Sequence, residues 1–149
     1  MTTAFQQNAP FASFLARWIV GLLFLMAGYW KVFVLTAQVH AQNFFVNDFS
    51  EHWIPSWLLW VLGLAIPYIE LAIGVLVCIG FRTREALMTM GLLLIATTYG
   101  HALHTPLFNI DGHTFTRLSL ILFVLLLGWE KDKTTIDYWL NQKHSKSTR

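Results

Sequence analysis

Four long apolar segments alternate with polar ones along this chain of 149 residues. A bilayer core about 30 Å thick needs roughly 20 apolar residues for each helical span. The pattern therefore predicts membrane-spanning helices at residues 11–35, 57–81, 85–104 and 115–129, the last of them short at its polar end. We expect an all-α membrane protein: one domain over residues 1–149, folded as a four-transmembrane-helix bundle.

Two polar stretches complete this pattern. Residues 36–56 form the longest predicted loop, and Trp53 and Trp57 flank Pro55 there as membrane-interface anchors do. The tail, residues 130–149, is predicted to form a short interfacial helix with three apolar side chains on one face, Ile136, Trp139 and Leu140.

The distribution of positive charge predicts an orientation. Lys and Arg are concentrated in the turn at residues 82–84 and in the tail, whereas the loops at 36–56 and 105–114 contain neither residue. Because cytoplasmic loops carry the excess of Lys and Arg, both termini and the 82–84 turn are expected in the cytoplasm.

Composition narrows the classes of protein. Hydrophobic residues make up 56% of the chain and charged residues 12%, about half the 25% of an ordinary soluble domain. This excludes a secreted soluble domain, a disordered chain and a nucleic-acid binder, and leaves membrane lipid as the surroundings. Cys78 is the single cysteine, so the chain has no cysteine pair of its own for thiol redox chemistry.

A few charges fall inside the predicted spans, where each costs about 2.5 to 3.5 kcal/mol at the helix centre. Glu70 lies near the middle of its span, and Lys31, His101 and Arg117 lie about 8 to 10 Å outward at 1.5 Å per residue. Helical spacing places Arg17, Gly21, Phe24, Gly28 and Lys31 on one stripe, and Gly63, Pro67, Glu70 and Gly74 on another.

These positions predict a polar cavity in the outer half of the bundle, lined by Lys31, Glu70, His101 and Arg117. The alternative is a structural ion pair of Glu70 with Lys31 or Arg117. For Arg17 we expect a structural role, with its side chain reaching the inner headgroups.

Three segments resemble known motifs. Residues 17–31 (RWIVGLLFLMAGYWK), 67–84 (PYIELAIGVLVCIGFRTR) and 128–137 (GWEKDKTTID) are similar, in that order, to the motifs of the DoxX family. The resemblance implies a four-helix protein of the bacterial inner membrane associated with oxidoreductase chemistry. The family is named after a subunit of a thiosulfate:quinone oxidoreductase, and other members are linked to oxidant defence or to maturation of metal-binding peptides.

The leading hypothesis is a quinone-binding subunit of a redox complex. A quinone needs an apolar slot, donors at its carbonyls and a proton route. Donors and proton carriers are then expected among the catalytic candidates Glu70, Lys31, His101 and Arg117, and the same side chains would bind the ring together with Tyr68 and Tyr99.

Two other hypotheses stay open. An outer metal site would use His101, His104, Asp111 and His113, a nitrogen and oxygen set that suits Zn, Cu or Fe; a bis-histidine haem is less well matched because only the third span carries histidines. A non-catalytic anchor or assembly subunit would instead dock a partner redox enzyme through an aromatic flank, Phe44, Phe45, Phe49, Trp53 and Trp57.

Overall fold

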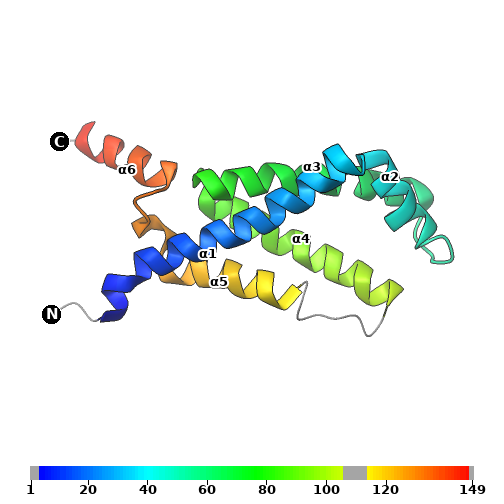
Figure 1. Cartoon of the computed structure of the whole chain (residues 1–149), viewed down its shortest axis with the longest axis horizontal. Coiled ribbons are helices and arrows are strands. Elements are labelled where there is room, and N and C mark those ends of the chain that lie inside the picture. Colours follow the sequence, from blue (N-terminus) through cyan, green and yellow to red (C-terminus); the bar gives the residue numbers. More distant parts are fainter. Residues whose placement is uncertain (1–3, 106–113, 148–149) are drawn as a thin grey trace.

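The computed structural model describes residues 4–105 and 114–147, with side chains for 7–105 and 114–143. Three long apolar helices and a shorter one form the bundle (Figure 1). They are α1 (Ala4–Tyr29), α3 (Ser56–Ile79), α4 (Thr83–His104) and α5 (Thr116–Leu127). The all-α prediction is confirmed for this part of the chain.

The fourth predicted span is shorter than the other three. α5 has 12 residues, which rise about 18 Å at 1.5 Å per residue and do not cross a bilayer core of about 30 Å. The helix ends at Gly128, whose φ of 84° is left-handed and terminates the α-helical hydrogen bonding. The helices long enough to cross a membrane are therefore three in the described chain, α1 extended to Val34, α3 and α4.

The prediction of a loop at residues 36–56 is wrong for residues 37–47, which are helical. A short π-helix, η1 (Trp30–Val34), leads through Thr36 into α2 (Ala37–Ala41) and a second π-helix, η2 (Gln42–Asn47). The Thr36 hydroxyl accepts a hydrogen bond from the Val39 amide and so caps α2. No regular hydrophobic period marks these helices because their buried side is built from His40, small residues and aromatic rings.

α1 and α3 pack closely along the two stripes that helical spacing placed on each of them separately. A Cβ atom at Gly28 would meet the backbone of Leu71, and one at Gly74 would meet the backbone of Leu25. At Gly21 it would meet the Cys78 side chain. Small residues allow this approach between helices in lipid, so the glycines set how closely α1 and α3 lie.

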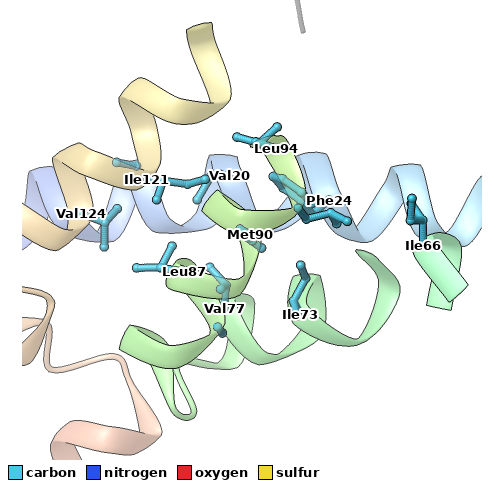
Figure 2. Close-up of a cluster of buried hydrophobic side chains, with 13 residues drawn as sticks. Val20, Phe24, Ile66, Ile73, Val77, Leu87, Met90, Leu94, Ile121 and Val124 are labelled. Carbon is cyan, nitrogen blue, oxygen red and sulfur yellow. The ribbon is translucent and has the colours of Figure 1, made fainter. Parts of the chain in front are cut away.

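The core lies where the four helices meet. Figure 2 shows side chains from each of them converging, among them Phe24, Val77, Met90 and Ile121. Large apolar side chains also cover the outer surface of the helices, for example Leu92 and Leu126. This outer surface is that of a protein surrounded by lipid.

α6 (Ile136–Ser147) closes the fold at the end where α1 begins (Figure 1). Its Asp137 carboxylate accepts hydrogen bonds from the amides of Arg82, at 2.8 Å, and Thr83, at 2.7 Å. These amides are unpaired at the start of α4, so Asp137 caps that helix from a distant part of the chain. Ile136, Trp139 and Leu140 are exposed, and which side of the membrane this end faces stays a prediction.

Replacing Gly74 tests the close packing of α1 and α3. We expect Gly74→Ala to lower the free energy of unfolding by about 1 to 3 kcal/mol, because the added methyl group meets rigid backbone. Gly91→Ala is the matched control, since a Cβ there has no neighbour within 4 Å. Denaturant titration in detergent micelles measures both, and equal stability of the two variants would contradict the packing described.

Candidate functional site

Arg17 is fully buried at the α6 end of the bundle. Its Nε donates to Asp132 Oδ2 at 2.9 Å. Its Nη1 donates to the carbonyl oxygens of Val77, at 2.7 Å, and Cys78, at 2.6 Å. Its Nη2 donates to the Thr134 hydroxyl at 2.7 Å. One guanidinium therefore joins α1, the last turn of α3 and the segment that follows α5.

The prediction that Arg17 reaches the inner headgroups is wrong, although its structural role is confirmed. The α3 carbonyls and the carboxylate lie close enough to satisfy the guanidinium inside the protein. Asp132 is itself held, because its Oδ1 accepts from the Thr134 amide at 3.0 Å and the Thr134 hydroxyl at 2.6 Å. A buried ion pair is favourable only when its remaining polar atoms are satisfied in this way.

Removing the carboxylate should leave the Arg17 charge uncompensated. We expect Asp132→Asn to destabilise the fold by about 3 to 5 kcal/mol, the usual cost of breaking a buried pair. Glu130→Gln, two residues away and exposed, is the control and should change stability little. Thermal unfolding in detergent compares the two, and a wild-type melting temperature for Asp132→Asn would show that the pair does not hold the helices.

Lys31 and Glu70 form the second charged site, which lies near the middle of α3 and just after the end of α1. Lys31 Nζ donates to Glu70 Oε2 at 2.6 Å. The Glu70 side chain is 4% exposed and that of Lys31 is 23% exposed. Glu70 belongs to the buried face of α3, whereas Lys31 lies in the short π-helix η1. A π-helical turn within or after an α-helix is often found at functional sites. Of the two partners predicted for Glu70, the structure selects Lys31.

His40 was not predicted as a site residue, yet it lies buried beside this pair. Its Nδ1 donates to the Gly63 carbonyl at 2.9 Å, and both neighbouring charges act on it. Burial is the largest influence and lowers the pKa of His40 below the ordinary value of 6.5; the Gly63 hydrogen bond raises it, the Lys31 charge lowers it and the Glu70 charge raises it. No sequence signal marks His40, because its burial depends on α2 folding onto α3.

The lowered pKa of His40 predicts sensitivity to acid. The folded state holds His40 neutral and the unfolded state protonates it near pH 6.5, so this contribution to stability is complete above that pH and is lost as the pH falls below it. His40→Gln keeps a donor for the Gly63 carbonyl and should flatten the decline between pH 7 and 5. The exposed His104, changed to Gln, is the control; unfolding curves at several pH values that decline equally in both variants would contradict this assignment.

Arg117 lies apart from Glu70. It is on the stripe of α5 that carries the buried Ile121 and Val124, and its guanidinium carbon is 5.5 Å from the centroid of the Phe24 ring. Such a contact is worth about 0.5 to 2 kcal/mol. Arg117 is half-buried as the second residue of the short helix α5.

The other predicted ring-binding residues lie on outward surfaces. Tyr68 and Tyr99 are more than half exposed, and His101 is exposed near the end of α4. The structure thus brings together Lys31 and Glu70 from the predicted cavity lining, places Arg117 against Phe24, and adds His40.

The predicted metal ligands fall partly outside the described residues, since Asp111 and His113 lie between 105 and 114. Of the two that are described, His104 Nδ1 donates to the Asp48 carbonyl at 3.2 Å and its ring lies against Phe49. Within residues 4–105 and 114–147, no group of three or more His, Cys, Asp or Glu side chains is placed to hold a metal ion.

Comparison with known proteins places this geometry in a family. The family model described as "Methylamine utilisation protein MauE" matches residues 9–108, about two thirds of the chain. The chain belongs to the MauE family. MauE is related to the DoxX family, so the motif resemblance identified the correct group of families but not the family itself. No curated protein and no solved structure matches the chain.

The MauE match spans α1 to α4. It includes Arg17, Lys31, His40 and Glu70, whereas Asp132, the ion-pair partner of Arg17, and Arg117 lie beyond it. Together with the three long apolar helices, the match shows a multi-pass membrane protein of the MauE family.

Proposed function

We propose that this MauE-family chain is a membrane subunit of methylamine utilisation that supports the assembly of a partner redox enzyme and is not itself the electron carrier. The observation that carries this proposal is that Arg17, Lys31 and Glu70, the charged groups within the spans α1 and α3, bind groups of the same chain. Charged groups that pair within one chain fix the positions of its helices relative to one another in lipid. A subunit that supports the assembly of a partner enzyme requires such a fixed arrangement.

The segment between α1 and α3 supplies a surface for such a partner. Of the five aromatic residues predicted as a docking flank, Phe45 and Phe49 pack inward against histidine rings. Phe44, Trp53 and Trp57 remain exposed, with Trp53 78% exposed. Aromatic side chains are enriched in protein interfaces as well as at the membrane boundary, so this flank supports both attachment to the membrane surface and contact with a partner.

Binding of a quinone at the Lys31–Glu70 pair is the second candidate function. Lys31 is partly exposed and donates one of its three N–H groups to Glu70, which leaves donors for a carbonyl oxygen. Glu70 and His40 would then hold or move a proton near that oxygen. A bound quinone would supply the two-electron chemistry, and the partner enzyme would supply the electrons.

Replacing the Lys31–Glu70 pair by apolar residues distinguishes the assembly function from quinone binding. A buried pair exchanged as a whole for apolar residues often leaves stability unchanged, so Lys31→Met combined with Glu70→Met should preserve the fold. In a strain that lacks this protein, we expect the amount of mature methylamine-oxidising enzyme to fall at least fivefold. When the double variant is expressed in that strain, it should restore both the amount of mature enzyme and the activity of each enzyme molecule.

Quantitative immunoblotting and methylamine-dependent respiration of membranes measure the two quantities, with Gly91→Ala as the matched control. A double variant that restores the amount of enzyme but not respiration contradicts a function in assembly alone and supports the quinone site. A deletion strain with normal amounts of active enzyme contradicts both functions.

A further inference from the structure

Pro67 interrupts the hydrogen bonding of α3 inside the bundle. It lies within this helix and is fully buried. Because proline has no amide hydrogen, the carbonyl of the residue four positions earlier, Gly63, loses its helical donor. Within a membrane such a carbonyl needs another partner, which a neighbouring segment often supplies. A helix that lacks one hydrogen bond also bends more easily at that point, and we call residues 63–67 of α3 the proline hinge.

His40 of α2 supplies the missing donor. Its Nδ1 donates to the Gly63 carbonyl at 2.9 Å, and the residue is 5% exposed. α2 comes this close because residue 63 is a glycine, where a Cβ atom would lie 2.6 Å from the Cα of Ala41. α2 is therefore docked on α3 at the carbonyl that Pro67 leaves without a helical partner.

The backbone that leads into α2 is strained. Thr36 has a φ of 72° and a ψ of 142°, and a positive φ is a genuine outlier for a β-branched residue. Such a conformation persists only where the surrounding structure holds it. Release of α2 from α3 would therefore let Thr36 relax, which favours the released state.

The segments that meet at the proline hinge also carry the Lys31–Glu70 pair. Lys31 lies in η1, which leads through Thr36 into α2. Glu70 follows Pro67 by about one helical turn on the buried face of α3. Movement of α2 would therefore displace η1 with Lys31, and bending at Pro67 would displace Glu70.

We propose that α2 is a latch on the proline hinge and that its release exposes the Lys31–Glu70 pair. In the docked state, His40 completes the hydrogen bonding of α3 and the pair stays largely buried. In the released state, the Gly63 carbonyl loses its donor, α3 bends at Pro67 and Lys31 becomes accessible. This latch operates whether the pair serves assembly of a partner or binding of a quinone.

Protonation of His40 favours release. Among the described residues, the charges that act on it are Lys31 of η1 and Glu70 of α3, and η2 places the rings of Phe44 and Phe45 against it. Burial is the largest influence and holds the pKa of His40 below 6.5, whereas an exposed His40 regains that ordinary value. The docked state is therefore fully stable above pH 6.5 and weakens as the pH falls below it.

Hydrogen–deuterium exchange of the full chain in nanodiscs measures release of α2 through the amides of residues 37–47. His40→Phe keeps a ring but removes the donor, so these amides should exchange about tenfold faster, the effect of an unpaired buried carbonyl. Pro67→Ala restores an amide at position 67 for the Gly63 carbonyl. In that background, His40→Phe should change the exchange rate by less than about twofold.

Two controls accompany this comparison. Ile69→Ala changes an exposed side chain of α3 and adds no amide, so His40→Phe should keep its full effect in that background. Lowering the pH from 7.5 to 5.5 should speed exchange about three- to tenfold in the wild type, after correction for the intrinsic rate, and leave His40→Phe unchanged. Equal effects of His40→Phe with and without Pro67 would overturn the latch, and exchange that does not depend on pH would overturn its control by His40 protonation.

The reactivity of Lys31 tests whether the latch controls the charged pair. Acetic anhydride modifies accessible amines, and mass spectrometry measures the rate at Lys31 relative to the exposed Lys131 in the same molecule. We expect His40→Phe to raise this ratio at least threefold and Pro67→Ala to suppress the increase. Faster exchange of the α2 amides with an unchanged Lys31 ratio would overturn the proposal that the latch exposes the pair.

Discussion

A charge within a membrane protein must find its counter-charge and its hydrogen-bond partners inside the chain, and Arg17 is where this constraint organises the whole fold. Its guanidinium binds the carboxylate of Asp132 and the carbonyls of Val77 and Cys78 at once. Those contacts hold the last turn of α3 against α1 and attach the segment that follows α5 to both helices. Nearby, Asp137 caps α4, so all the long helices are tied at one end.

The two charged sites of the bundle differ in how far they are exposed. At the α6 end, hydrogen bonds join Arg17, Asp132 and Thr134, and Arg17 and Asp132 are buried. Near the middle of α3, Lys31 remains partly exposed beside the buried Glu70, and burial holds the pKa of His40 below its ordinary value. The proposed quinone site therefore lies at the Lys31–Glu70 pair and the proposed docking flank on the segment between α1 and α3, whereas the Arg17 contacts are structural.

The three motifs that linked the chain to the DoxX group have physical roles in this structure. Arg17, Gly28 and Lys31 of the first motif make the buried pairs and the close approach to α3. Glu70 of the second motif is the partner of Lys31. Asp137 of the third caps the helix that the arginine-containing turn begins. Motifs of this kind preserve a fold, which explains why they identified a group of related families more surely than an activity.

The sequence alone determined the environment, the helical class, the glycine-containing stripe on each of the first two long helices, and Lys31 and Glu70 as candidate residues, since membrane thickness and helical periodicity act locally along the chain. Only the tertiary structure decided which charges meet: Arg17 with Asp132, 115 residues apart, Glu70 with Lys31 and not Arg117, and His40 against Gly63. Such pairings depend on the distance and direction between side chains of different helices, which periodicity within one helix does not contain.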